Sequence, residues 1–313
     1  MKAVFLLACL CAAARAGWLS GEAASIDGPR QLFQAGRYEK VVGALGDGLL
    51  QKLRGADQQD GYYYLGLSYE RLGRLDKALG VYQLGVKLFP RDINLLTQLA
   101  MLLHTSGLEE QAEPLFQKVL AIHPNNAAAH LGLAQIDHSL GFLDLSVAHY
   151  QKALETMGDN PAVWREYSEV SLDRRDYATA EQAARRALAL SSDPDGMLDL
   201  ARALRASGRL DQAIATLDLA AQRFPRRRDL SLARALWRLE EGRYDEALPL
   251  AQALLAAPDP PALAYWIRAR VELKRDGYQA AVADLRSAAA SEGDDSSFVA
   301  AASEKLLALL GAR

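Results

Sequence analysis

Apolar side chains recur every three or four residues along most of the chain. Between residues 61 and 72 the large side chains stand at Tyr62, Leu65, Tyr69 and Leu72. Positions at this spacing lie on one face of an α-helix. Gly73 can adopt the left-handed conformation that ends a helix, and Pro90 ends the helix that follows. The pattern therefore predicts a helix–turn–helix unit over residues 61–90.

Small residues mark the same unit repeatedly, at a nearly constant interval. A first series is spaced by 34, 34, 34, 33, 34 and 34 residues, at Ala78, Ala112, Ser146, Ala180, Ala213, Ala247 and Ala281. A second series stands twelve residues earlier, at Gly66, Ala100, Ala134, Ser168, Ala201, Ala235 and Ala269. Glycines precede the first series by five residues at Gly73, Gly107, Gly141, Gly208 and Gly242. Two series that keep register seven times predict seven stacked copies of one helical hairpin.

The small residues have a steric reason. Gly66 and Ala78 stand where the two helices of one hairpin are expected to cross with little room for side chains. A bulky residue at such a crossing costs about 1–3 kcal/mol through overpacking.

By these residues the chain resembles the tetratricopeptide repeat family. The family pattern of large or aromatic residues, Leu-Gly, Tyr, Ala and Pro is matched at Tyr62, Leu65, Gly66, Tyr69, Ala78, Tyr82 and Pro90. The resemblance implies an all-α fold, a right-handed superhelix (α-solenoid) of about seven to eight helix-turn-helix repeats. It also implies a concave groove that serves as a protein-interaction platform.

The ends of the array are less regular than its middle. Residues 59–293 hold the seven repeats, and residues 17–58 read equally well as a degenerate N-terminal repeat or as a simple cap. Residues 294–313 are expected to form a C-terminal capping helix. Its apolar stripe consists of Phe298, Ala302, Leu306 and Leu309.

The first residues have the pattern of a secretory signal peptide. Lys2 is followed by an apolar run from Ala3 to Ala14, and Ala14-Arg15-Ala16 matches an A-x-A cleavage site. The run of 12 residues is shorter than the ~20 that span a bilayer. We therefore expect residues 1–16 to be a signal peptide cleaved after Ala16, and the mature protein to be periplasmic or secreted. Removing Lys2 and Arg15 changes the formal charge from −3 to −3 − 2 = −5.

Both cysteines of the chain lie inside this leader, at Cys9 and Cys11. A mature chain that begins after Ala16 has no thiol for a disulfide or a zinc-thiolate site. An alternative follows from Leu6-Leu7-Ala8-Cys9, which loosely resembles a bacterial lipobox. On that alternative the protein is an outer-membrane lipoprotein, and it contacts a membrane only through a lipid on Cys9.

The family resemblance also implies which positions face the groove. They lie on the first helix of each repeat, and the candidates are Tyr63, Met101, His104, Gln135, His138, Arg165, Glu169, Arg202, Arg205, Leu232, Leu236 and Trp266. The arginines among them could form a guanidinium cluster for a carboxylate-bearing segment. Alternatively, they form ion pairs between repeats, with Glu169, Asp173 or Asp199 as the partners.

The last two repeats depart from the family pattern together. Arg234 and Arg268 stand where Leu is expected, and Arg238 replaces the usual Tyr. Leu232 and Leu236 belong to an apolar stripe on the side expected to face the groove. The stripe is either the floor of a binding groove or part of the core, on a helix rolled by one residue.

No catalytic motif stands out, so we expect no enzyme, no cofactor and no small-molecule substrate. The five histidines lack the spacing that places two ligands of a metal on one helix face. A formal charge of −3 with both signs mixed gives no electrostatic case for nucleic acid.

The sequence thus predicts an exported scaffold or adaptor that binds a protein or peptide segment in its groove. Its expected role is in the assembly or maintenance of a bacterial envelope complex. The alternatives are a lipid-anchored structural component of a pilus or secretion machine, and a targeting subunit for a separate enzyme.

Overall fold

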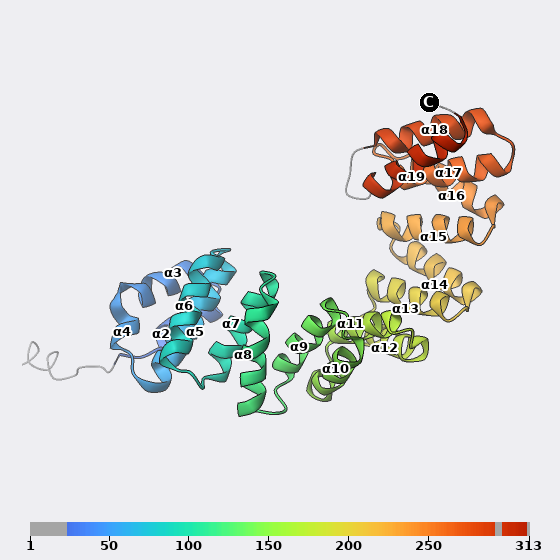
Figure 1. The fold of residues 1–313 in the computed structure, drawn as a ribbon. Coiled ribbons are helices and arrows are strands. Elements are labelled where there is room, and N and C mark those ends of the chain that lie inside the picture. Colours follow the sequence, from blue (N-terminus) through green and yellow to red (C-terminus); the bar gives the residue numbers. More distant parts are fainter. Residues whose placement is uncertain (1–23, 292–295, 312–313) are drawn as a thin grey trace, which may run out of the picture. The chain divides into compact units, whose positions relative to one another are not determined.

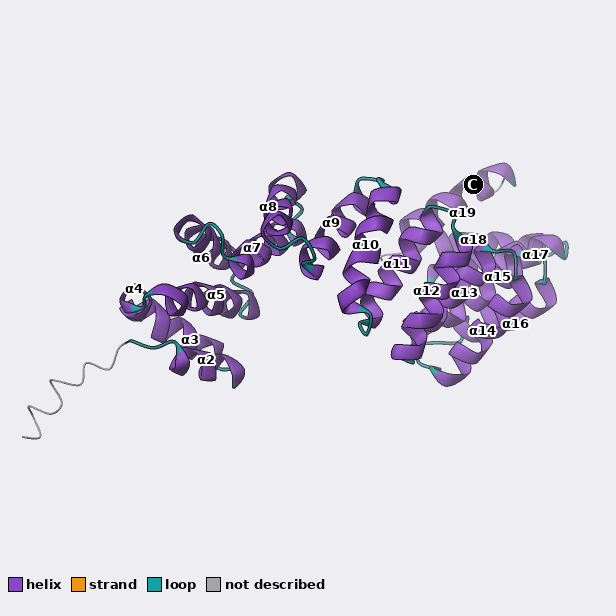
Figure 2. Ribbon diagram, turned by 90° about the horizontal axis from the view of Figure 1, so that it is seen from below, coloured by secondary structure: helices purple, strands orange, loops and turns teal. Residues whose placement is uncertain are grey.

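The computed structural model describes residues 24–291 and 296–311. Those residues form helices joined by short turns, and no β-strand occurs among them (Figures 1 and 2). The expected all-α fold is therefore confirmed. The expected signal peptide with Cys9 and Cys11 lies outside the described residues, as do residues 292–295. The chain divides into two compact units, with the boundary between Thr156 and Met157.

The first unit is a succession of helix pairs. Its helices are α2 (Asp27–Gln34), α3 (Tyr38–Ala44), α4 (Leu50–Lys52), α5 (Gly55–Arg71), α6 (Leu75–Leu88), α7 (Ile93–Thr105), α8 (Glu109–Ile122), α9 (Ala127–Ser139) and α10 (Leu143–Met157). A short π-helix, η1 (Leu45–Leu49), joins α3 to α4. Helices α2 and α3 pack on each other and on α5. The N-terminal segment therefore forms a helix pair stacked on the first full repeat.

The second unit continues the same plan. Its helices are α11 (Pro161–Asp173), α12 (Tyr177–Leu190), α13 (Pro194–Ala206), α14 (Leu210–Arg223), α15 (Arg228–Glu240), α16 (Tyr244–Leu255), α17 (Ala262–Lys274), α18 (Tyr278–Ala290) and α19 (Ser296–Leu309). The first eight of these form four consecutive pairs, and α19 packs on α17 and α18. With α2/α3 and the three pairs from α5 to α10, the described residues contain eight helix pairs and a closing helix.

The turn inside each of the seven hairpins contains a residue in the left-handed conformation. The five glycines of the sequence pattern have φ angles from 71° to 78°, which confirms their expected role. In the two repeats that lack the glycine, Arg175 (φ 65°) and Asp276 (φ 60°) take the same conformation. A side chain makes this conformation costly, so the hairpin imposes its turn on these two residues at the expense of local strain.

The two small-residue series face each other across the hairpins. In the third repeat the Ser146 hydroxyl donates a hydrogen bond to the Ala134 carbonyl oxygen at 2.7 Å. In the fourth repeat the direction reverses, because the Ser168 hydroxyl donates to the Ala180 carbonyl oxygen at 2.8 Å. A side chain oxygen this close to the opposite backbone confirms that the helices cross at these positions.

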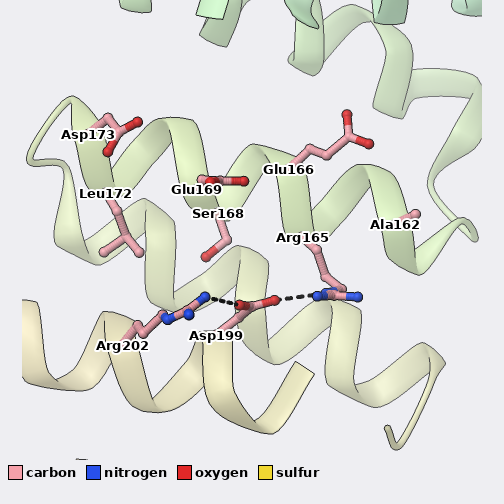
Figure 3. Close-up of a pocket in the computed structure, with 9 residues that line it drawn as sticks. All are labelled: Ala162, Arg165, Glu166, Ser168, Glu169, Leu172, Asp173, Asp199 and Arg202. Carbon is pink, nitrogen blue, oxygen red and sulfur yellow. Dashed lines mark hydrogen bonds and ion pairs between the residues drawn. The ribbon is translucent and has the colours of Figure 1, made fainter. Parts of the chain in front are cut away.

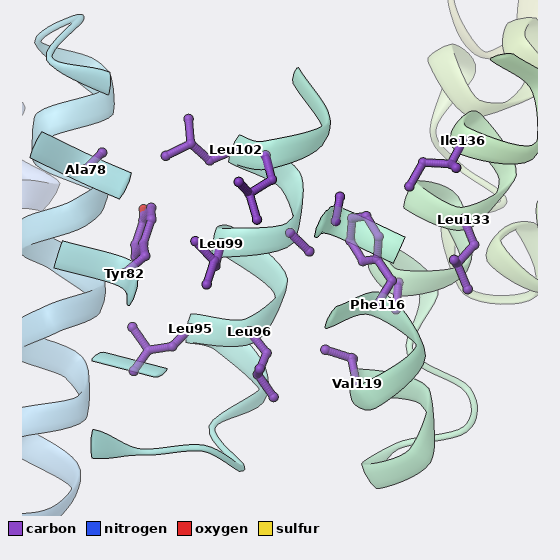
Figure 4. Packing of buried hydrophobic residues seen from close by; sticks show 14 of the residues in the cluster. Ala78, Tyr82, Leu95, Leu96, Leu99, Leu102, Phe116, Val119, Leu133 and Ile136 are labelled. Atoms are coloured by element: carbon purple, nitrogen blue, oxygen red, sulfur yellow. The ribbon is translucent and has the colours of Figure 1, made fainter. Parts of the chain in front are cut away.

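Glycine allows the closest approaches in the core of the first unit. A Cβ atom added to Gly66 would lie 2.2 Å from Cε1 of Tyr82, and one added to Gly132 would lie 2.2 Å from Cζ of Phe116. Both rings are fully buried. Phe116 lies among leucines of α7 and residues of α9 in one continuous cluster (Figure 4).

The arginines in the last two repeats are satisfied by carboxylates on neighbouring helices. Asp218 of α14 accepts hydrogen bonds from Arg234 (2.7 Å) and from Arg238 (2.6 Å), both on α15. Arg268 of α17 makes a bidentate pair with Asp284 of α18, at 2.7 and 2.6 Å. The Arg238 side chain is only 7% exposed. Buried charge replaces the apolar residues that the family pattern leads one to expect, and each guanidinium has a partner.

The expected stripe on the C-terminal helix is wrong at its two ends, whereas Leu306 packs against the core cluster of α17 and α18 as expected. Phe298 and Leu309 are 80% and 75% exposed, whereas Val299, Ser303 and Leu307 form the buried face of α19. Helix α19 carries apolar side chains on more than one of its faces, so periodicity alone does not determine which face packs. The contacts with α17 and α18 decide it.

Candidate protein-binding site

A cleft of about 590 Å³ lies between α11 and α13 in the second unit. Its lining residues are Ala162, Arg165, Glu166, Ser168, Glu169, Leu172, Asp173, Asp199 and Arg202. The volume is in the range of known ligand sites, about 300–1,000 Å³. Three of the candidates from the sequence meet here, namely Arg165, Glu169 and Arg202 (Figure 3).

One carboxylate holds both arginines of the cleft. Asp199 lies between Arg165, whose Nε donates to its Oδ2 at 2.7 Å, and Arg202, whose Nη1 donates to its Oδ1 at 3.3 Å (Figure 3). Burial opposes the charge on Arg165, but its hydrogen bond to Asp199 and the nearby carboxylates outweigh burial and raise the pKa of the guanidinium. Because each arginine already has a counterion, the cleft contains no free guanidinium pair for a carboxylate.

The remaining carboxylates make the cleft acidic. Glu166, Glu169 and Asp173 of α11 join Asp199, so the lining carries 2 − 4 = −2 formal charges. Glu169 is exposed, and no described residue forms an ion pair with it. The lining also includes the apolar side chains Ala162 and Leu172. The cleft can therefore neutralise a positively charged group beside an apolar contact.

The other arginine of the predicted cluster is engaged elsewhere. Arg205 forms an ion pair with Glu240 of α15, and its guanidinium carbon lies 4.8 Å from the ring centre of Trp237. The pairing of arginines between repeats is thus observed, with Asp199 among the partners named from the sequence and Glu240 as an addition. Arg165 and Asp199 are 34 positions apart in the chain, and Arg205 and Glu240 are 35 positions apart, which is about one repeat.

Leu232 and Leu236 of α15 are half-buried. Leu236 packs against two neighbouring core clusters. Ala235 is fully buried and Arg238 stays in the interior, so α15 keeps the same register as the other first helices. Trp266 of α17 is also half-buried, with the Arg270 guanidinium carbon 5.1 Å from its ring centre.

Five candidates lie in the first unit, on the first helices of three repeats. Tyr63 is half-buried on α5, Met101 is 43% exposed on α7, and Gln135 and His138 are half-buried on α9. His104 on α7 has a buried Nδ1 atom without a hydrogen-bond partner among the described residues. These side chains belong to a separate unit from the α11–α13 cleft, and each unit contributes its own candidates.

Sequence reasoning missed two features. Glu166 of the cleft has no distinct signal in the family pattern. The histidines looked scattered, yet His130 and His149 meet across α9 and α10. In the part of the chain that the structure describes, no cluster of three His, Cys, Asp or Glu side chains is arranged for a metal ion. No described helix combines the length and hydrophobicity needed to cross a bilayer.

Repeated helix hairpins with small residues at each crossing define a class of stacked helical-repeat proteins. Family models described as tetratricopeptide repeat match residues 59–92, 103–165, 139–196, 169–228, 198–262 and 230–297. The chain belongs to the tetratricopeptide repeat family. Proteins of this family are typically non-catalytic scaffolds, and their repeats generally bind peptide segments of partner proteins.

Similar proteins share the repeat and little sequence. The BBSome complex member BBS4 of Bos taurus is 25% identical over 126 residues, 40% of this chain and 24% of that protein's length. A tetratricopeptide repeat protein from Parabacteroides merdae is similar in structure, with a TM-score of 0.60, 18% identity and coverage of 80% of this chain and 98% of the other. The type IV pilus biogenesis factor PilW is also similar in structure, with a TM-score of 0.58 and 19% identity. The match covers 64% of this chain and 94% of PilW. These likenesses show the fold.

Proposed function

We propose that this protein is an exported scaffold that binds a segment of a partner protein in the cleft between α11 and α13. The observation that carries the proposal is the cleft itself, where side chains of two successive repeats converge in a family that generally binds peptide segments. Arg165 and Arg202, both paired with Asp199, line one side of the cleft. Pre-organised polar groups lower the ordering cost of binding.

The charge of the cleft indicates the chemistry of the segment. The exposed carboxylate of Glu169, which lies in the cleft without an ion pair to any described residue, favours a segment with a Lys or Arg side chain over one with a carboxylate. Leu172 supplies an apolar contact for the stem of such a side chain. The guanidinium-cluster hypothesis, which called for an acidic segment, has less support because both arginines of the cleft are paired.

Capture of partners by the purified mature protein tests this function. Wild-type protein should retain a defined partner from an envelope extract, and Glu169→Lys should retain less, because it turns the exposed carboxylate of the cleft into a cation. Glu304→Lys is the matched control, since Glu304 is exposed on α19 outside the cleft. Equal capture by Glu169→Lys, Glu304→Lys and wild type would exclude the cleft as the binding site.

The proposed setting is the assembly or maintenance of a bacterial envelope complex. The signal-like leader at residues 1–16 supports export. Mass spectrometry of the mature N-terminus distinguishes the proposed forms. A chain beginning at Gly17 supports a periplasmic or secreted scaffold. A diacylated Cys9 would instead support a lipid-anchored component of a pilus or secretion machine.

A further inference from the structure

Two histidines that are 19 residues apart in the sequence meet in the α9–α10 hairpin of the first unit. The Nδ1 atoms of His130 (α9) and His149 (α10) lie 2.9 Å apart, and their ring centres are 5.2 Å apart. His130 is 8% exposed, and the side chain of His149 is 28% exposed. The contact joins the two helices of the hairpin, with one ring buried and the other partly exposed.

The neighbours of His130 determine where its hydrogen is. Its Nε2 lies 2.9 Å from the carbonyl oxygen of Pro124, in the turn between α8 and α9. A carbonyl oxygen can only accept, so Nε2 of His130 carries the hydrogen and its Nδ1 has a lone pair. The Nδ1 of His149 must then be the donor in the contact between the rings. This arrangement links the Pro124 turn, α9 and α10 in one chain of hydrogen bonds.

A carboxylate completes the group. Oδ2 of Asp137 on α9 lies 3.9 Å from Nε2 of His149. Burial, followed by the charge of Glu113 on α8, raises the pKa of Asp137. Burial, followed by the nearby His130, lowers the pKa of His149. The carboxylate beside the histidines is therefore Asp137 of α9, and the charge of Glu113 on α8 acts on Asp137.

The geometry allows one hydrogen between the two Nδ1 atoms and no more. Protonating both rings would place an N–H group on each Nδ1 across 2.9 Å, and the hydrogen bond would become a repulsion between two cations. We propose that His130 and His149 form a pH-sensitive latch that holds α9 and α10 to the Pro124 turn near neutral pH and releases them on acidification.

The direction of the effect follows from proton counting. The contact has room for one hydrogen between the two Nδ1 atoms, so the folded pair binds fewer protons than the two free histidines of the unfolded chain, whose pKa is about 6.5. The contribution of the contact to stability is therefore present above that pH and is lost as the pH falls below it, and the lowered pKa of His149 has the same sign. Asp137 acts in the opposite sense, because its raised pKa favours a bound proton in the folded state. The two effects separate in an Asp137→Asn variant, which cannot titrate at this position.

The latch would also control a binding surface. Helix α9 carries Gln135 and His138, two of the candidate groove residues. Loosening α9 at low pH would weaken partner binding there, a consequence that rests on the proposed function. The opening of the hairpin can be measured without a partner, so failure of the latch and failure of the binding function are distinguishable.

Hydrogen exchange of the purified protein tests the latch. After correction for the intrinsic effect of pH on exchange, the opening equilibrium constant of the amides in α9 and α10 should rise with acidification. The rise should reach about tenfold per pH unit below the pKa of an unfolded histidine. Amides of α5 and α6 serve as the reference. His149→Gln should remove the pH dependence specific to α9 and α10, and Asp137→Asn should strengthen it. His123→Gln should leave it intact, because His123 is exposed in the same unit.

Two results would overturn the latch. One is an equal pH response of α5, α6, α9 and α10, or an unchanged response in His149→Gln. The other comes from nitrogen-15 spectra of the wild-type imidazoles at neutral pH, which do not depend on any variant folding. The expected hydrogens are on Nε2 of His130 and Nδ1 of His149, and the opposite tautomers would contradict the proposed hydrogen-bond chain.

Discussion

Gly132→Ala tests whether glycine permits the close packing of α9 on α8. The added Cβ would lie 2.2, 2.4 and 2.7 Å from three ring atoms of Phe116. Ordinary contact begins near 3.4 Å, so the ring or the helix must move by about 3.4 − 2.2 = 1.2 Å. Phe116 is fully buried among leucines of the same core cluster, so a shift of its ring disturbs that packing.

Two terms set the size of the effect. Overpacking a core costs about 1–3 kcal/mol. Replacing Gly by Ala inside a helix stabilises by about 1 kcal/mol. Gly132→Ala should therefore be neutral to destabilising by about 2 kcal/mol. Gly80→Ala in α6 is the matched control, because nothing lies within 4 Å of its added Cβ and it should gain the helix term alone.

Urea unfolding followed by circular dichroism measures both variants. Subtracting the change in the free energy of unfolding of Gly80→Ala from that of Gly132→Ala cancels the gain in helix propensity. The remainder should equal the overpacking cost, about 1–3 kcal/mol. Phe116→Leu should lower the free energy of unfolding less in the Gly132→Ala variant than in the wild-type protein, because the smaller side chain makes room for the methyl group. Equal stability of Gly132→Ala and Gly80→Ala would refute the packing argument.

Three further substitutions probe the repeat itself. Arg175→Gly should stabilise the protein by about 1 kcal/mol by relieving the left-handed conformation, and an unchanged melting temperature would contradict the strain. Asp284→Ala should cost about 2–3 kcal/mol, because it leaves Arg268 without its bidentate partner, as chemical denaturation would show. Ala180→Leu should cost about 1–3 kcal/mol at the crossing, whereas Ala215→Leu on an exposed face of α14 should cost little; equal melting temperatures would overturn the register.

Several features of the fold follow from local sequence alone. The helices follow from the apolar spacing, and the turns at the five glycines follow from the backbone freedom of that residue. The crossings follow from small residues such as Ser146 and Ala134, because only small side chains fit where two helices touch. These signals depend on residues close in the chain or one hairpin apart, and each repeats with the array.

Tertiary structure alone decided the rest. Asp218 and Asp284 look like ordinary surface acids until packing places them beside arginines of neighbouring helices. His130 and His149 meet only because α9 and α10 fold back on each other. The α11–α13 cleft likewise needs two stacked repeats. Periodicity tells which residues share a face of a helix, whereas contacts between helices determine which charges are paired, which face is buried and where a partner can bind.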